Sequence, residues 1–162
     1  ETQLQAYEIK ELDKRLINYD LTRILRGKNV LLKFKVSVKE DKAIAKPKEM
    51  KLLSYFLKRM VRKGTSYVED SFSTECKDAK IRIKPFLITR RKVSRAVRKA
   101  LREKAKEELI NYVKNKNTET LFEELLKGQI QKTLSLILKK IYPLALCEIR
   151  IFKVEKELEN KQ

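Results

Sequence analysis

The residues best suited to chemistry in this sequence are the cations between Ile81 and Lys106, because guanidinium and ammonium groups bind phosphate oxygens. Eleven basic residues stand in this stretch against one acid, Glu103, which leaves more than half of the chain's formal charge of +18 here. Helix faces that only keep a protein soluble usually mix both signs as i,i+4 pairs, and this stretch hardly does so. The one-sided charge favours a polyanion such as a nucleic acid over a simple solvated surface.

Two elements would position these cations, a strand followed by a helix. Residues 81–88 alternate as in a strand, with Ile81, Ile83 and Leu87 on one face, whereas residues 92–112 have helical spacing. At about 100° per residue, one side of this helix is apolar and the other is cationic. The apolar side comprises Val93, Ala96, Val97, Ala100 and Leu101, and the cationic side comprises Arg91, Arg95, Arg98, Lys99, Arg102 and Lys106. We therefore predict that the turn 89–92 and the helix present a cationic stripe to phosphates.

The predicted phosphate contacts form a main set and a second set. The main set, in the turn and the helix, comprises Arg90, Arg91, Lys92, Arg95, Arg98, Lys99 and Arg102. The second set comprises Lys28, in a hairpin turn that it shares with Arg26, and Lys58, Arg59, Arg62 and Lys63, at the end of an earlier helix. Cations at a helix C-terminus also complement the helix dipole, but four of them exceed what capping requires.

The side chains on which most enzymes rely are scarce. The chain has no His, so the commonest general base is missing, and its three glycines cannot build a phosphate-binding glycine loop. Cys76 and Cys147, without His, cannot complete a tetrahedral zinc site. As two lone cysteines they indicate reduced thiols. We therefore expect no enzyme activity, no catalytic residue, no cofactor, no metal ion and no small-molecule substrate.

Two other functions stay open from the residues alone. Glu8-Ile9-Lys10 has the E-x-K form of one metal-dependent nuclease superfamily, but the residues before Glu8 include no Asp, which that superfamily also needs. Residues 91–106 have the charge of a basic amphipathic helix on a peripheral membrane protein, although their apolar face contains Val and Ala rather than Trp, Phe and Leu. No apolar run approaches the ~20 residues of a membrane span.

The strands and helices of the whole chain are grouped rather than alternating, which favours an α+β fold of one domain. Strands are predicted at 4–10, 19–25, 30–38, 66–73, 79–88 and 146–154. Helices are predicted from Pro47 to Gly64, at 92–112, and from Thr120 to Pro143 with an interruption at Gly128, and residues 39–46 are predicted to form a loop. The order is β-ββ-α-ββ-α-α-β, with an RNA-binding domain at residues 1–155 and a charged tail at residues 156–162.

Several blocks of sequence, in matching order, resemble one protein family. They are Tyr7-Glu8-Ile9 with Glu11-Leu12, Gly27-Lys28-Asn29 with Leu32 and Phe34, Ile88-Thr89-Arg90-Arg91, Leu121-Phe122-Glu123-Glu124-Leu125, and Ile141-Tyr142-Pro143-Leu144 followed by Glu148-Ile149-Arg150. Taken in this order, the five blocks resemble the family's first strand, its hairpin, its basic turn, its penultimate helix and its C-terminal signature. The family is the S-three-a, or S-one-e, family of archaeal and eukaryotic small-ribosomal-subunit proteins, and the resemblance covers residues 4–155.

The resemblance implies a structural, non-enzymatic protein of the small ribosomal subunit, on the platform near the messenger exit and the 3′ end of the small-subunit RNA. It also implies a small, mostly antiparallel, β-barrel-like sheet flanked by about four helices. The implied partners are small-subunit ribosomal RNA and neighbouring platform proteins, with no membrane. The implied location is the cytoplasmic ribosome, and the nucleolus during assembly if the source is a eukaryote.

Departures from the family pattern indicate a divergent or trimmed member. Val36 stands where the family usually has Gly, and residues 77–80 stand where it has an Asp-Gly turn. Residues 43–47 replace an acidic segment before the first helix. The usual basic N-terminal segment with a Trp-Tyr element is not present, and the first residue is Glu1 rather than Met. We therefore expect that an N-terminal piece is missing from this sequence.

Overall fold

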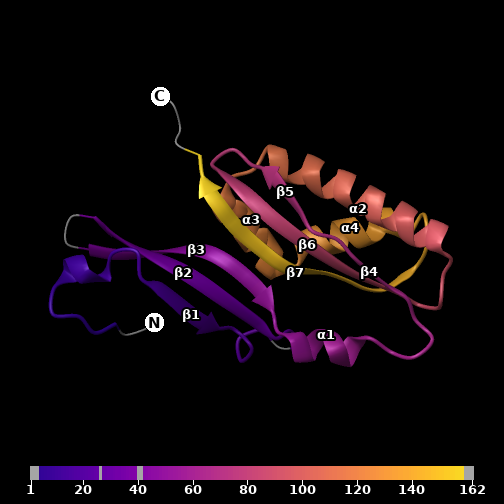
Figure 1. The fold of residues 1–162 in the computed structure, drawn as a ribbon, viewed down its shortest axis with the longest axis horizontal. Helices are drawn as coiled ribbons and strands as arrows, with labels where there is room; N and C mark the ends of the chain where they lie inside the picture. The colour runs from indigo at the N-terminus through magenta and orange to yellow at the C-terminus, as the bar shows by residue number, and fades with distance from the viewer. Residues whose placement is uncertain (1–3, 26, 40–41, 159–162) are drawn as a thin grey trace.

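A computed structural model describes residues 4–25, 27–39 and 42–158 of the chain, and its fold is shown in Figure 1. Its elements run in the order η1 (Ile9–Leu12, a 3₁₀ turn), β1 (Leu16–Asp20), β2 (Val30–Lys39), β3 (Lys42–Leu52), α1 (Ser54–Met60), β4 (Tyr67–Glu69), β5 (Phe72–Glu75), β6 (Ala79–Thr89), α2 (Arg95–Lys114), α3 (Thr118–Lys127), α4 (Gln129–Leu138) and β7 (Leu144–Glu157). The predicted α+β class, with four helices beside an antiparallel sheet, is confirmed.

The strands form one antiparallel sheet in the order β1-β2-β3-β7-β6-β4, and β5 also pairs with β6. Strands β1 and β4 end this path, so within the described residues the sheet is open and does not close into the barrel-like form that the resemblance implied. The last strand, β7, lies between β3 and β6, which come from two separate parts of the chain. This long C-terminal strand therefore joins the two halves of the sheet.

Helices α2, α3 and α4 pack on one face of the part of the sheet formed by β5, β6 and β7 (Figure 1). The alternation of β6 explains which face they cover, because Ile81 and Ile83 are fully buried while Arg82 between them is exposed. On β7, Phe152 is buried and meets the ring of Phe122 from α3 edge-on, with 4.9 Å between the ring centroids. The face that carries Arg82 is called the open face below.

The N-terminal prediction is wrong in two places. Residues 4–10 do not form a strand, because amide groups bond to carbonyls three residues back, Glu11 to Glu8 and Asp13 to Lys10, and bend the chain into η1. The next strand is β1 and ends at Asp20 rather than continuing to Leu25. After Asp20 the amide of Leu25 donates to the carbonyl of Leu21 at 2.8 Å, which closes a turn. The predicted antiparallel pairing of this strand with β2 is confirmed.

The loop predicted at 39–46 and the helix predicted from Pro47 are also wrong, because β3 occupies that part of the chain. Pro47 lies opposite Phe34, where the register between β2 and β3 shifts, and a residue without an amide hydrogen is tolerated at such an irregularity. Met50 and Leu52 are buried two residues apart, as in a strand. The helix that follows, α1, is therefore confined to Ser54–Met60.

The second half of the chain follows its predictions more closely. The single strand predicted at 66–73 is divided into β4 and β5, and both pair with β6. The register between β6 and β7 shifts between Lys84 and Pro85, where a residue without an amide hydrogen is tolerated. Gly128 ends α3 with a positive φ of 74° and separates it from α4, as its position indicated. Strand β7 is longer than predicted and continues to Glu157, into the segment predicted to be a tail.

Candidate nucleic-acid interface

The basic turn after β6 is held in place by a buried threonine, Thr89. Its backbone amide donates to the carbonyl of Ser66 at 2.9 Å, and the Ser66 amide donates to the Thr89 hydroxyl at 3.1 Å. The same hydroxyl lies 2.7 Å from the carbonyl of Arg91, and the amide of Val93 donates to the Ser66 hydroxyl at 3.3 Å. These bonds attach both ends of the turn to Ser66, which follows α1 in the chain.

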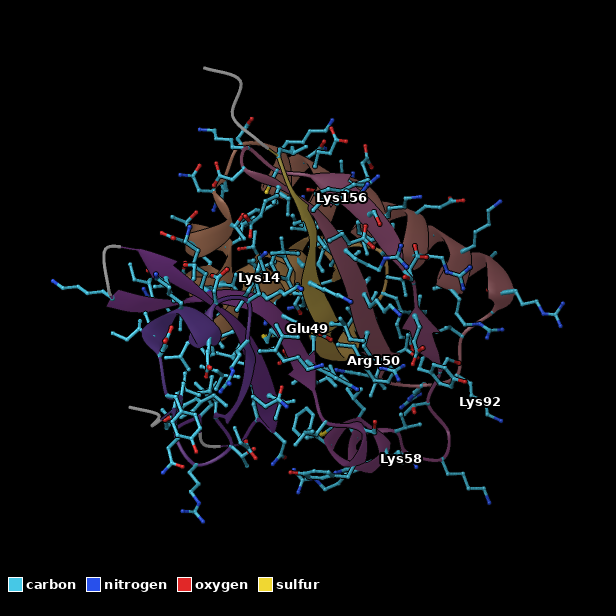
Figure 2. The ribbon with its side chains drawn as sticks, turned by 60° about the vertical axis from the view of Figure 1, so that its left-hand side comes forward. Lys14, Glu49, Lys58, Lys92, Arg150 and Lys156 are labelled. Carbon is cyan, nitrogen blue, oxygen red and sulfur yellow. The ribbon has the colours of Figure 1, made fainter. Side chains whose placement is uncertain are left out.

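This attachment brings the turn together with the basic end of α1. Lys58 and Arg59 lie in the last turn of α1, and Arg62 and Lys63 follow it in a turn that Gly64 closes with a φ of 87°. The Thr65 hydroxyl donates to the Arg62 carbonyl at 2.7 Å and stabilises that turn. Figure 2 shows Lys58 and Lys92 at the same end of the molecule. We call this surface the basic end, and it comprises Lys58, Arg59, Arg62, Lys63, Arg90, Arg91 and Lys92, all of which are exposed.

The cations of α2 divide into those at its start and those further on. Ser94 caps the helix by accepting a hydrogen bond from the amide of Val97, so the helix begins three residues later than predicted. Arg95, Lys99 and Arg102 are exposed. Arg98 is half-buried, and its Nε has no hydrogen-bond partner in the described structure. Arg98 therefore lies beside the core rather than on the outer stripe.

The buried face of α2 differs from the predicted one. Leu101 is buried as expected, but Ala96 and Ala100 are exposed. The residues that face the core continue from Leu101 at intervals of four to Ala105, Leu109 and Val113. The apolar side predicted from residues 93–101 is therefore rotated about the helix axis relative to the side that is buried. The prediction was wrong because it relied on small residues near the helix start.

Carboxylates neutralise Lys104 in the middle of α2. Lys104 Nζ lies 3.0 Å from Glu107 Oε2 and 3.0 Å from Glu108 Oε1. The hydrogen bonds that Lys104 donates, first to Glu107 and then to Glu108, raise the pKa of Lys104. Lys99 and Glu103 are 3.8 Å apart and both exposed, so this pair is weak. The one-sided charge is thus concentrated in the turn and at the start of the helix.

Lys28 was predicted to contact phosphate, but in the structure it contacts a carboxylate. Its Nζ lies 2.7 Å from Oε1 of Glu148 on β7, and only 7% of Glu148 is exposed. The pair lies in a groove of about 810 Å³ between the turn after β1, the junction of α3 and α4, and β7. Burial, together with the neighbouring Glu148, raises the pKa of the Cys147 thiol in this groove to about 12. Arg26, the other cation of the predicted turn, lies outside the described residues.

Further cations that the sequence prediction omitted lie on the open face. Arg82 on β6 is the register partner of Lys153 on β7, and Lys84 is the partner of Ile151. Arg82 Nε is 2.6 Å from Glu155 Oε1, so part of this charge is neutralised. The alternation of residues 81–84 could have assigned Arg82 and Lys84 to the same face of this strand. The position of Lys153 beside Arg82 could not be predicted, because it depends on the pairing of strands that are distant in the chain.

The structure was also compared with what a metal-dependent nuclease and a membrane protein would require. Glu8 and Lys10 are exposed at the 3₁₀ turn rather than on a strand. Among the described residues there is no group of three or more His, Cys, Asp or Glu side chains that could hold a metal ion. In residues 4–158, apart from the undescribed positions, no helix is both long and apolar enough to span a membrane.

Comparison with known proteins identifies the family. The Ribosomal S3Ae family matches residues 5–157. Proteins named "Small ribosomal subunit protein eS1" from Pyrobaculum arsenaticum and Pyrobaculum aerophilum are each 30% identical over 159 residues, which cover 95% of this chain and 72% of each relative. The protein of the same name from Pyrobaculum neutrophilum is 28% identical over 157 residues, covering 94% of this chain and 71% of that protein. The chain therefore belongs to the ribosomal S3Ae family, and it is a structural ribosomal protein rather than an enzyme.

Proposed function

We propose that this chain is a structural constituent of the small ribosomal subunit that binds ribosomal RNA phosphates through the basic end and the start of α2. The observation that carries the proposal is the meeting of two basic segments at one surface. Seven exposed cations, from residues 58–63 and 90–92, lie on segments that Thr89 and Ser66 hold together. The names of the relatives support the small subunit as the assembly in which this surface is used.

The mechanism is neutralisation of phosphate charge on folded RNA. Each cation that contacts a phosphate releases condensed counterions, and this release favours binding most strongly at low salt. Most of these contacts would be to the RNA backbone, so they would recognise the shape of the RNA rather than its base sequence. A turn fixed by partly buried hydrogen bonds loses little conformational entropy on binding, which favours a rigid cationic surface over a flexible tail.

The proposed position is the platform of the cytoplasmic small subunit, near the messenger exit and the 3′ end of its RNA. The support is the resemblance of residues 141–144 and 148–150 to the C-terminal signature of the family. Exposed apolar side chains such as Ile24 and Leu136, both at the groove around Lys28, are the proposed contacts with neighbouring platform proteins. The RNA-binding domain is proposed to extend to Glu157, because β7 continues to that residue.

Sedimentation of tagged protein from native lysate tests this proposal. The wild-type chain should migrate with small subunits in sucrose gradients at moderate salt and should lose that position after ribonuclease treatment. The variant Arg90→Gln, Arg91→Gln, Lys92→Gln should shift to light fractions as salt rises. A control variant, Lys33→Gln, Lys104→Gln, Lys127→Gln, removes the same charge from cations that are paired with carboxylates. Migration of the wild-type chain in light fractions alone would exclude the proposed role.

A further inference from the structure

A second groove lies between α1 and the edge of the sheet, next to the basic end. It measures about 340 Å³ and lies beneath Leu57 and Lys58 of α1 and beside Tyr67, Glu69, Phe86 and Arg150 of the sheet. We call it the Tyr67 groove. Lys58 belongs to both the groove and the basic end, and Figure 2 shows Lys58 and Arg150 on the same side of the molecule. RNA held at the basic end would therefore pass close to this groove.

Tyr67 gives the groove a supported aromatic surface. Its ring is stacked on that of Phe86, with 6.2 Å between the ring centroids and 22° between the ring planes. Phe86 is buried, whereas 56% of Tyr67 is exposed. Because Tyr67 and Phe86 lie on paired strands, β4 and β6, the tyrosine ring is held in one place. An exposed aromatic ring in a fixed position is a suitable surface for stacking by a nucleic-acid base.

Charged side chains line the same groove as this ring. Arg150 Nη1 lies 3.3 Å from Glu69 Oε2 and 3.4 Å from Glu69 Oε1, and both side chains remain partly exposed. Together they offer hydrogen-bond donors and acceptors of the kind that the edge of a base requires. Lys58 of α1 also lines the groove and is exposed, so its ammonium group can neutralise a phosphate. The groove therefore combines the three contacts that an unpaired nucleotide makes: stacking, edge hydrogen bonding and phosphate pairing.

We propose that the Tyr67 groove binds one unpaired nucleotide of RNA, with its base stacked on Tyr67 and its phosphate next to Lys58. This inference rests on the proposed function, since it requires that RNA reaches the basic end. It adds a different kind of recognition, because a base can stack on Tyr67 only where it has left the RNA helix. The ligand is thus a single-stranded loop, bulge or end, whereas the basic end contacts phosphates of either single strands or duplexes.

Binding of two RNA probes separates the groove from the basic end. The probes are a fluorescent oligouridylate and a duplex RNA of equal length, and affinity is measured by anisotropy over a range of salt concentrations. Tyr67→Ala should weaken oligouridylate binding by about fivefold or more, leave duplex binding unchanged and leave the salt dependence of both unchanged. Tyr67→Phe should keep wild-type affinity because it retains the ring. The matched control is Tyr55→Ala, since Tyr55 is exposed to a similar extent, 54%, and does not line the described groove.

Each remaining outcome decides against one part of the proposal. Wild-type affinity of Tyr67→Ala for oligouridylate would overturn the nucleotide site and leave the proposed function standing, provided that the basic-end variant still loses duplex binding. Equal loss of both probes by Tyr67→Ala would also overturn base stacking. If Tyr67→Ala unfolds, Tyr67→Leu replaces it, because leucine keeps an apolar contact with Phe86 but offers no aromatic face. A wild-type chain that binds neither probe would contradict the proposed function itself.

Discussion

The basic end and the groove around Lys28 contain cations that look alike in the sequence but have different neighbours in the structure. At the basic end, seven exposed cations from residues 58–63 and 90–92 make no ion pair with a carboxylate within the described residues. Lys28, by contrast, lies 2.7 Å from the nearly buried Glu148. The difference shows that the availability of a cation for phosphate depends on which carboxylate the fold brings to it, and that partner can be distant in the chain.

The same contrast appears within α2. Arg95 and Arg102 near its start are exposed and unpaired among the described side chains, whereas Lys104 is held by Glu107 and Glu108. Carboxylates three and four residues away are visible in a sequence, because a helix brings such positions together. A carboxylate partner on another strand cannot be recognised from the sequence in this way. Paired cations are expected to contribute to stability, and unpaired cations to RNA affinity, and each prediction below tests one side of this division.

The largest expected effect is the loss of RNA affinity in the variant Arg90→Gln, Arg91→Gln, Lys92→Gln. Its affinity for small-subunit RNA should fall by roughly 1,000-fold or more, since each of the three charge-assisted interactions contributes about 1.5 kcal/mol or more. The slope of log affinity against log salt should also fall in magnitude by about three, one for each phosphate that is no longer neutralised. Anisotropy titrations over a salt series measure both quantities. The free energy of unfolding should change by less than about 0.5 kcal/mol.

The control for this prediction is the variant Lys33→Gln, Lys104→Gln, Lys127→Gln, which removes an equal charge from paired cations. An equal loss of affinity and slope in the control would break the comparison, because net charge alone would then explain RNA binding. A much smaller loss in the control would show that position and pairing decide which cations bind.

Substitution of Lys28 should produce the opposite result. Lys28→Met leaves the buried carboxylate of Glu148 without its partner, so the free energy of unfolding should fall by about 2 kcal/mol. RNA affinity should change by no more than about twofold, because this lysine is engaged by Glu148 rather than by phosphate. Urea unfolding measures the first quantity, and anisotropy with the same RNA measures the second.

The double variant Lys28→Met, Glu148→Met is the matched control for the groove. Replacement of a buried ion pair by apolar side chains of similar size is often neutral, so most of the lost stability should return. If Lys28→Met instead lowers RNA affinity as strongly as the basic-end variant does, Lys28 belongs with the phosphate contacts and the division between the two regions is wrong.

Thr89 connects the two segments of the basic end, so its substitution should affect both stability and binding. Thr89→Val keeps the shape of the side chain but removes the hydroxyl that accepts from the Ser66 amide, which should cost about 1–2 kcal/mol of stability. RNA affinity should fall severalfold because residues 58–63 and 90–92 are then held together by fewer hydrogen bonds, the backbone bond from Thr89 to Ser66 and the bond from Val93 to Ser66 being kept. Thr133→Val is the control, since its hydroxyl bonds only to the preceding turn of an exposed helix position. An unchanged affinity in Thr89→Val would show that the two segments bind independently.

Much of the fold could be predicted because local patterns decided it. Ile81 and Ile83 alternate with Arg82 and Lys84, and the strand β6 follows from that pattern. Gly128 marks the break between α3 and α4 because few other residues adopt its positive φ at little cost. Strand β3 could not be predicted in this way. Its first residues are exposed on both sides, and only their pairing with β2, which is formed in three dimensions, keeps them extended.

The candidate site shows the same limit. Residues 90–92 stand out in the sequence as a run of cations, and the capping position of Ser94 explains where their helix begins. Their approach to residues 58–63 depends on hydrogen bonds between Thr89 and Ser66, 23 residues apart. The pairing of Lys28 with Glu148 depends on β7 crossing the middle of the sheet. Contacts of this kind follow from the topology of the sheet and have no local signature.

The smallest expected effect sharpens the comparison on the open face, where Arg82 is paired with Glu155. A hydrogen bond from Ser73, together with Arg82, lowers the pKa of Glu155 in the folded protein. A lowered pKa means that the pair adds stability above the pKa of the unfolded chain and loses it as the pH falls through the folded value. Glu155→Gln should therefore lower the free energy of unfolding by less than about 1 kcal/mol at neutral pH. This difference from wild type should disappear in acid, and urea unfolding over a pH series measures it.

The same variant, Glu155→Gln, releases Arg82 from its carboxylate, so RNA affinity should rise by roughly twofold at low salt. The control is Glu75→Gln, an exposed acid of the neighbouring strand β5 without an ion pair in the described residues, which changes net charge equally. If RNA affinity rises only in Glu155→Gln, release from a carboxylate makes a cation available to RNA. If RNA affinity rises equally in both variants, the change in net charge alone explains the effect.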